Sequence, residues 1–276
     1  MKHKIKMIGF DLDGTLLTTQ KTLTERTRRA LTEAVSKGVV ILPATGRPIT
    51  GVPDEVLHFP GVKYAVTANG ARVVEVATGR VIYEKLLPAE KARKILDIFE
   101  EYDTLREIYY DGKGYAEEAL LAQVDRYVPL SSMAAYVAST RVPVSSVREK
   151  FEAENRALDK IQALFADEAD KKDAWRRVEQ IEGVEVTGAL SNNIEVNEQG
   201  VQKGAALLRL GEQLGICREE IMAFGDGAND VMMIKTVGTG VAMANGIPQI
   251  IQAADILAES NDEDGVAKVI EQYVLG

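Results

Sequence analysis

Short apolar runs rich in β-branched residues alternate along the chain with segments whose apolar residues recur at helical spacing. The first runs are residues 4–10, which predict a buried strand, and residues 24–37, which predict an amphipathic helix. Gly38 is a typical helix-ending glycine, and residues 39–42 predict the next strand. This order is typical of βαβ units and predicts a mostly parallel sheet covered by helices.

The alternation changes between about residues 86 and 189. There the pattern predicts a helix, a strand pair, further helices, a strand, a helix and a strand. The clearest amphipathic helices lie near residues 88–101 and 167–181. We therefore expect an inserted α+β domain over residues 82–189.

The parallel pattern is expected to resume after the insert. The elements predicted there are a helix over residues 202–214, a closing helix over 263–274, and strands over 193–197, 220–224, 237–242 and 255–257. Residues 1–81 and 190–276 should together form one discontinuous core. The predicted fold class is α/β, a Rossmann-like, doubly wound parallel sheet interrupted by the α+β insert.

Composition narrows the chemistry that such a fold can perform. The 276 residues suffice for one large domain or two modest ones, and 46% of them are hydrophobic. A net charge of −9 without a basic block argues against a nucleic-acid-binding protein. One cysteine and two histidines exclude an intrachain disulfide and leave little for Cys/His metal clusters or a Ser-His-Asp triad. Carboxylates and lysines are the expected carriers of any catalysis.

Two further segments bear on where in the cell the protein is located. The apolar run near the N-terminus is interrupted by Asp11 and Asp13, so we expect no export signal. The longest uncharged run, residues 236–254, contains three glycines and a proline, and it predicts a strand, a turn and a helix rather than a membrane span. We expect a cytoplasmic protein with no membrane partner.

Polar residues follow three of the predicted parallel strands. Asp11 and Asp13 follow the first, Thr45 follows the second, and the sequence Gly225-Asp226-Gly227-Ala228-Asn229-Asp230 follows the strand that ends at residue 224. Because the carboxyl ends of parallel strands share one sheet edge, four carboxylates should crowd together there. Their mutual repulsion favours a hard divalent cation with oxygen ligands, Mg²⁺ before Ca²⁺.

Each of these motifs also has a plain structural interpretation. Asp-Gly occurs four times in the chain and is a common turn dipeptide. The spacing after Asp11 does not fit a calcium-binding EF-hand loop, and Gly238-Thr239-Gly240 lacks the third glycine of a dinucleotide-binding fingerprint. Lys203 by itself would be a solvated surface lysine. In the first turn of a helix, however, a cation is unfavourable unless an anion lies nearby, so a phosphate-binding role gains weight beside the carboxylates.

In combination, four ordered motifs give the chain a family resemblance. They are Asp11-Leu12-Asp13-Gly14-Thr15-Leu16, Thr45-Gly46-Arg47, Lys203-Gly204 and Gly225-Asp226-Gly227-Ala228-Asn229-Asp230. The chain resembles the haloacid dehalogenase-like phosphatases over essentially its whole length. Asn69-Gly70-Ala71, Gly240-Val241-Ala242-Met243 and the segment from Asn261 to Val266 resemble the Cof-type branch, in which a large α/β cap of the C2B type is inserted between the second and third motifs. The resemblance implies that residues 82–189 are this cap.

The resemblance also implies roles for individual residues. Asp11 would be the nucleophile that forms an aspartyl-phosphate, and Asp13 the general acid and base. Mg²⁺ would be bound by Asp11, by the backbone carbonyl of Asp13 and by Asp226, with Asp230 supporting the loop. The phosphate group would be held by Thr45, Gly46, Lys203 and Asn229, with Arg47 and Asn69 on the substrate side.

The expected function is Mg²⁺-dependent hydrolysis of a small phosphorylated metabolite, either a sugar phosphate or a phosphorylated cofactor such as flavin mononucleotide or pyridoxal phosphate. A phosphomutase and a non-enzymatic phospho-acceptor or sensor are the alternatives. Asp13 favours turnover over sensing, because a sensor gains nothing from an acid/base group that speeds the loss of its phosphoryl group. The substrate and the oligomeric state are not encoded in any motif.

Overall fold

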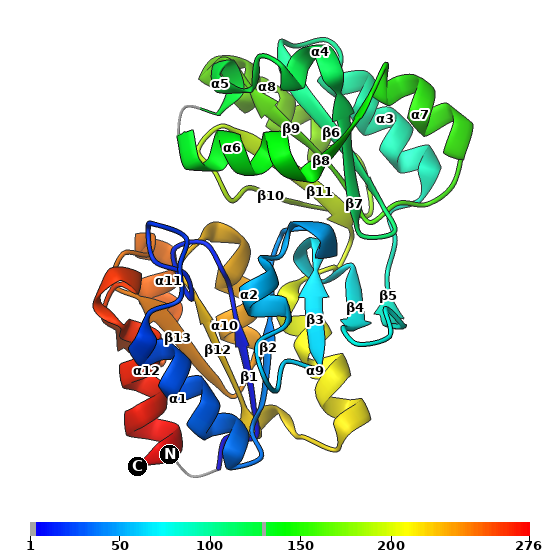
Figure 1. Ribbon diagram of the computed structural model, residues 1–276. Coiled ribbons are helices and arrows are strands. Elements are labelled where there is room, and N and C mark those ends of the chain that lie inside the picture. Colours follow the sequence, from blue (N-terminus) through cyan, green and yellow to red (C-terminus); the bar gives the residue numbers. More distant parts are fainter. Residues whose placement is uncertain (1–3, 129–130) are drawn as a thin grey trace. The chain divides into compact units, whose positions relative to one another are not determined.

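The computed structural model describes residues 4–128 and 131–276, which form two compact units (Figure 1). Of the described residues, the first unit contains 4–46, 52–84 and 202–276, and the second contains 47–51, 85–128 and 131–201.

A parallel five-stranded sheet is the centre of the first unit (Figure 1). Its strands lie in the order β14-β13-β12-β1-β2, and all four neighbouring pairs are parallel. The bounds are β1 (Met7–Phe10), β2 (Val40–Pro43), β12 (Ile221–Gly225), β13 (Thr239–Met243) and β14 (Ile256–Ala258). The chain starts in the middle of the sheet and reverses its winding direction there, which places β1 and β12 side by side at the switch point where ligands bind in such sheets.

Helices cover both faces of this sheet, as the doubly wound prediction requires. On one face Ile8 and Phe10 pack with α1 (Glu25–Ser36) and α12 (Gly265–Ile270). On the other face Met7 packs with α9 (Lys203–Leu214) and α10 (Val231–Thr236). The alternation of side chains along a strand sends successive residues of β1 into these two separate cores. The shorter helices of this unit are α2 (Asp54–Leu57) and α11 (Pro248–Ala253).

A small antiparallel sheet completes the first unit. It contains β3 (Tyr64–Thr67), β4 (Arg72–Glu75) and β5 (Val81–Glu84) in that order. A parallel bridge between Ala44 and Val66 connects it to the chain just beyond β2.

The second unit is built on a six-stranded sheet in the order β10-β11-β9-β6-β7-β8. The strands are β6 (Thr104–Tyr110), β7 (Lys113–Glu117), β8 (Arg141–Val144), β9 (Lys160–Phe165), β10 (Val184–Thr187) and β11 (Asn193–Glu198). The helices are α3 (Ala89–Phe99), α4 (Glu118–Leu121), α5 (Val124–Tyr127), α6 (Ser131–Thr140), α7 (Val147–Glu154) and α8 (Glu168–Val178). Apolar residues of α3, α7 and α8 pack on one face of the sheet. The predicted combination of an α/β core and an α+β insert is confirmed.

One predicted element belongs to a different sheet than expected. Residues 193–198 are not a core strand, because β11 pairs antiparallel with both β9 and β10. Ile194 and Val196 are buried in the apolar core of the second unit, while Glu195 between them and the flanking Asn193 and Asn197 are polar. This polar–apolar alternation is typical of an antiparallel sheet with one apolar face.

The limits of the insert differ accordingly from residues 82 and 189. The second unit runs from Lys85 to Val201, because β5 pairs with β4 of the first unit and β11 with β9 of the second. Residues 47–51 also belong to the second unit by their contacts. In this segment the amide of Thr50 donates to the carbonyl oxygen of Gly112 over 3.3 Å.

Candidate active site

The loop after β1 places Asp11 at the carboxyl end of the sheet. The amide of Asp11 donates to the carbonyl oxygen of Phe224 on β12 over 2.9 Å, so the loops after β1 and β12 start side by side. Gly14 adopts a φ of +80°, and a Cβ atom there would overlap with Oδ2 of Asp226. Thr15 donates its hydroxyl to Oδ1 of Asp226 over 2.6 Å. The two motifs are therefore packed directly against one another.

Asp230 shapes the loop after β12. Its Oδ2 accepts hydrogen bonds from the amides of Asp226 and Gly227 over 3.2 and 3.1 Å. The Asp230 side chain also fills the space next to Gly225, where a Cβ atom would overlap with it. This buried carboxylate thus fixes the turn that directs Asp226 toward the first loop.

Lys203 connects the two loops electrostatically. The side chain is fully buried, and its Nζ lies 2.6 Å from Oδ1 of Asp11 and 2.6 Å from Oδ1 of Asp230. Burial alone would lower the pKa of Lys203, but the two carboxylates outweigh this effect and raise it. The lysine is therefore held as a cation at the start of α9, where the expected anions are indeed present.

Asp11 and Asp226 are both shifted toward their neutral forms when no cation other than Lys203 is present. Burial raises the pKa of Asp11 well above its ordinary value; Lys203 opposes this shift, and repulsion from Asp230, Asp226 and Asp13 adds to it. Burial and repulsion from Asp230 raise the pKa of Asp226 to about 7, against the lowering effect of the Thr15 hydrogen bond. This cluster carries more negative charge than one lysine compensates.

The donor set fits a hard divalent cation. Carboxylate oxygens of Asp11, Asp226 and Asp230 lie within 4.8 Å of one another. Oxygen donors in this arrangement are the ligands that Mg²⁺ and Ca²⁺ prefer. Both oxygens of Asp230 already accept hydrogen bonds from Lys203 or backbone amides, which leaves Asp11 and Asp226 as the better placed ligands.

The loop after β2 contributes Thr45 and Gly46. Thr45 is buried, and its amide donates to the carbonyl oxygen of Val66 over 2.9 Å. The carbonyl oxygen of Thr45 accepts from the amide of Asn69 over 3.0 Å, and Asn69 adopts a left-handed φ of +61°. Asn229 donates its side-chain amide to Oδ1 of Asn69 over 3.3 Å. The structure therefore brings Asn69, Asn229 and the Thr45 loop together.

The family model of the haloacid dehalogenase-like hydrolases matches residues 8–270. The chain belongs to this family. It is 30% identical over 98% of its length to the 5-amino-6-(5-phospho-D-ribitylamino)uracil phosphatase YcsE of Bacillus subtilis, with 96% of that protein covered. It is 26% identical over 98% of its length to the pyridoxal phosphate phosphatase YbhA of Escherichia coli, with 99% of that protein covered.

A solved haloacid dehalogenase-like hydrolase from B. subtilis superimposes with a TM-score of 0.85 at 30% identity, covering 97% of this chain and 99% of the other. The expected class of enzyme is thereby confirmed: the chain is a phosphoric monoester hydrolase of the haloacid dehalogenase-like family.

Among the described residues, no helix combines the length and apolarity needed to cross a membrane. The cytoplasmic location stays a prediction.

Within this hydrolase, Asp13 is not one of the three aspartates whose carboxylate oxygens lie within 4.8 Å of one another, although its charge acts on Asp11 and Asp226. Its Oδ1 is 2.6 Å from Nζ of Lys21, and about a quarter of each side chain is exposed. Lys21 is a neighbour of a predicted site residue that no sequence pattern indicates, because it belongs to no motif and lies eight positions further along the chain.

Arg47 has partners in the second unit. Its guanidinium group lies 4.0 Å from the centre of the Tyr136 ring and donates to the carbonyl oxygen of Gly51 over 2.8 Å. Arg47 and Asn69 are both predicted to face the substrate, but their contacts in the structure differ. Asn69 contacts another predicted site residue, whereas Arg47 is held by its own loop and by Tyr136.

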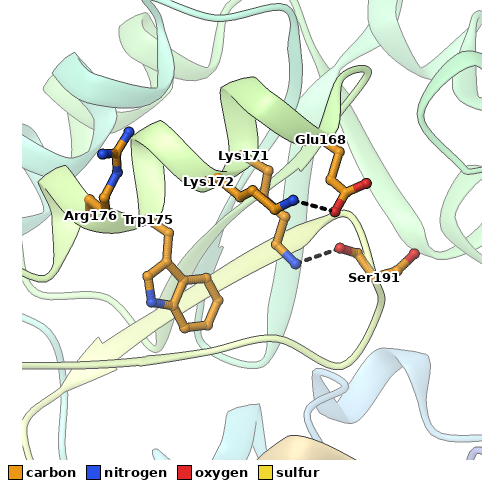
Figure 2. Close-up of a pocket in the computed structure, with 6 residues that line it drawn as sticks. All are labelled: Glu168, Lys171, Lys172, Trp175, Arg176 and Ser191. Atoms are coloured by element: carbon orange, nitrogen blue, oxygen red, sulfur yellow. Dashed lines mark hydrogen bonds and ion pairs between the residues drawn. The ribbon is translucent and has the colours of Figure 1, made fainter.

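A surface pocket of about 640 Å³ lies along α8 of the hydrolase (Figure 2). Its lining residues are Glu168, Lys171, Lys172, Trp175, Arg176 and Ser191. Lys172 pairs with Glu168 over 2.8 Å, and Lys171 donates to the carbonyl oxygen of Ser191 (Figure 2). None of the site residues predicted from the sequence is among the lining residues described, and the charged groups there are paired with neighbours.

Proposed function

We propose that this hydrolase is a Mg²⁺-dependent phosphatase of small phosphorylated metabolites that works through an aspartyl-phosphate on Asp11. The observation that carries the proposal is the buried contact of Lys203 with Asp11 and Asp230, beside Asp226. A carboxylate in this position has a cation on one side and oxygen donors for a metal on the other. Such a setting suits a nucleophile that must approach a phosphate dianion.

The first chemical step is an in-line displacement. A carboxylate oxygen of Asp11 attacks phosphorus, the bond from phosphorus to the ester oxygen breaks, and Asp13 gives its proton to the departing alkoxide. In the second step Asp13 takes a proton from water while the water oxygen attacks the same phosphorus. The bond from phosphorus to the Asp11 oxygen then breaks, which releases inorganic phosphate and restores both carboxyl groups.

Four groups are proposed to hold the non-bridging phosphate oxygens: the Thr45 hydroxyl, the Gly46 amide, the Lys203 ammonium group and the Asn229 side-chain amide. These donors stabilise negative charge where it develops. Asn69 supports this set because it accepts a hydrogen bond from Asn229 and donates one to the Thr45 carbonyl oxygen. That Arg47 lies on the substrate side of the site stays a prediction.

Asp11, Asp226 and the backbone carbonyl of Asp13 would hold Mg²⁺, with Asp230 fixing the loop. When bound, the metal ion offsets the charge of the phosphoryl group and of the carboxylates around it. The raised pKa values of Asp11 and Asp226 support this assignment, because they show that the cluster resists full ionisation without added positive charge.

For the substrate we propose a phosphorylated cofactor or cofactor precursor, or a sugar phosphate. The support is similarity only: YcsE and YbhA are named for a ribitylaminouracil phosphate and for pyridoxal phosphate. A phosphomutase is the alternative within the same chemistry, because it shares the aspartyl-phosphate step.

The test is a panel of these phosphate esters assayed for released inorganic phosphate, with Mg²⁺ and after removal of metal with EDTA. We expect release with Mg²⁺, loss of release in EDTA, and recovery when Mg²⁺ is restored. Asp11→Asn should be inactive, while the control Asp54→Asn, on a surface helix with an exposed side chain, should match the wild type. Full activity in EDTA would contradict the proposed requirement for Mg²⁺. Conversion of a substrate to an isomeric phosphate ester without release of inorganic phosphate would indicate a phosphomutase.

A further inference from the structure

The loop after β1 contains a lysine that contacts the proposed general acid. Nζ of Lys21 lies 2.6 Å from Oδ1 of Asp13, and the two side chains are 27% and 26% exposed. Ion pairs with this much solvent access add little to folding stability, because water screens the attraction and two side chains lose freedom. The pair therefore needs a reason other than stability.

The backbone conformation of Lys21 is a second, independent indication that folding stability does not account for this residue. Its φ of +62° lies in the left-handed region, which is unfavourable for a lysine and is usually occupied by glycine or asparagine. A tight turn holds it there: the amide of Lys21 donates to the carbonyl oxygen of Thr18 over 2.8 Å, and the amide of Thr18 donates to that of Thr22 over 3.0 Å. The chain thus accepts a backbone cost at the residue that contacts Asp13.

The loop that carries Lys21 is fixed to the rest of the first unit. Asp262 accepts hydrogen bonds from the amide and the hydroxyl of Thr19 over 2.8 and 2.7 Å. Asn261 donates its side-chain amide to the carbonyl oxygen of Leu17 over 2.9 Å. Because the loop is anchored on both sides of Thr18, the ammonium group reaches Asp13 from a fixed position.

We propose that Lys21 is a positioning residue that holds the Asp13 carboxyl group in the direction needed for proton exchange with the leaving group and with water. The inference rests on the proposed function, in which Asp13 performs both proton transfers. Lys21 itself transfers no proton and touches no reacting atom in this account. Holding one oxygen restricts rotation of the carboxyl group, and small errors in such orientation reduce rates strongly.

The test compares Lys21→Met and Lys21→Arg with the wild type, using glycerol 2-phosphate as a poor leaving group and 4-nitrophenyl phosphate as a good one. We expect Lys21→Met to lower kcat for glycerol 2-phosphate about tenfold and to change KM less than about twofold. The loss with 4-nitrophenyl phosphate should be smaller, and Lys21→Arg should recover most of the activity. Lys21→Asn, which suits the left-handed backbone, should reproduce the loss if Lys21→Met folds poorly.

Lys6→Met is the matched control, because it removes another partly exposed lysine–carboxylate pair of the same unit, with Glu220 at 2.6 Å. The decisive comparison is made in the Asp13→Asn background, where Lys21→Met should change kcat less than about twofold. An unchanged kcat in Lys21→Met, or the same tenfold loss with and without Asp13, would overturn the proposal. A wild-type protein that hydrolyses neither ester nor any panel compound would instead overturn the proposed function on which it rests.

Discussion

Among single residues, Asp226 links metal binding to pH. Its pKa of about 7 in the metal-free protein lies above its ordinary value, so folding strengthens proton binding there. The stability contributed by this proton is complete at pH below about 4 and is lost as the pH rises toward 7. Because Mg²⁺ competes with the proton, the increase in Tm on adding Mg²⁺ should be larger at about pH 8 than at about pH 5.5.

Thermal melts of chelator-treated protein, with and without Mg²⁺, measure this difference. Asp226→Asn is the control, since it should abolish most of the Mg²⁺-dependent increase at both pH values. Equal increases in Tm at the two pH values in the wild type would contradict the assignment of Asp226 as a ligand of Mg²⁺.

Asp13 gives a second prediction for a single residue. Asp13→Asn should slow alkyl phosphates more than 4-nitrophenyl phosphate, by at least about tenfold, because only a poor leaving group needs a proton as it departs. Steady-state kcat/KM values for the two esters provide the comparison. Equal losses would exclude Asp13 as the general acid.

The candidate site residues were largely predictable from the sequence, because each follows a recognisable strand and carries a distinctive side chain. Asp11, Asp226, Asp230 and Lys203 do lie together. The contact between Lys21 and Asp13 was not predictable. It depends on a turn in which Lys21 adopts a left-handed backbone conformation, and a lysine in the sequence does not indicate such a conformation.

At the level of the elements, the tight approach of the loops after β1 and β12 depends on Gly14. A Cβ at this position would overlap with Asp226, and the φ of +80° adds strain for any other residue. Gly14→Ala should therefore weaken Mg²⁺ binding at least about tenfold and lower kcat/KM with it. Titration calorimetry with Mg²⁺ and steady-state kinetics measure the two effects.

Gly38→Ala is the matched control for Gly14→Ala. Gly38 has nearly the same φ, +83°, but no atom lies within 4 Å of the place where its Cβ would stand. It should lose about 1 kcal/mol of stability from backbone strain, which corresponds to roughly 2–4 °C in Tm, and keep its Mg²⁺ affinity. If Gly14→Ala behaved like Gly38→Ala, the contact between the two loops would not matter for the metal site.

The elements of the core were also predictable, because parallel strands and their covering helices have distinct apolar periods. The prediction that residues 193–197 form a strand of the parallel core is wrong, because β11 pairs with β9 and β10 of the second unit. The alternation of polar and apolar residues in β11 is typical of a strand in an antiparallel sheet, but its position just before α9 favours the resuming core pattern. Sequence order alone does not tell on which side of a domain boundary a strand pairs.

For the whole molecule, the division into two units separates most of the predicted site residues from the insert. With the exception of Arg47, the predicted site residues belong to the first unit, and the second has its own sheet and apolar core. We propose that the second unit is a cap that selects the substrate and excludes water. Replacing residues 85–201 with a short Gly/Ser linker should leave a folded core that binds Mg²⁺ and hydrolyses 4-nitrophenyl phosphate, but discriminates poorly among metabolites.

Circular dichroism, Mg²⁺ titration and the substrate panel together check this variant. A truncated core that kept the substrate ranking of the full chain would assign specificity to loops of the first unit, such as the one containing Asn69. The sequence did not predict that residues 47–51 associate with the insert, because this depends on contacts such as that of Arg47 with Tyr136.

The most direct test of the account is to identify the residue that carries the phosphoryl group during turnover. The enzyme is quenched while hydrolysing its best panel substrate with Mg²⁺, reduced with borohydride, which converts an aspartyl-phosphate to homoserine, and analysed by peptide mass spectrometry. We predict homoserine at position 11, dependent on substrate and absent in Asp11→Asn. Homoserine at another aspartate, or an unmodified Asp11 under conditions where the chemical trap captures a synthetic acyl phosphate, would contradict the account.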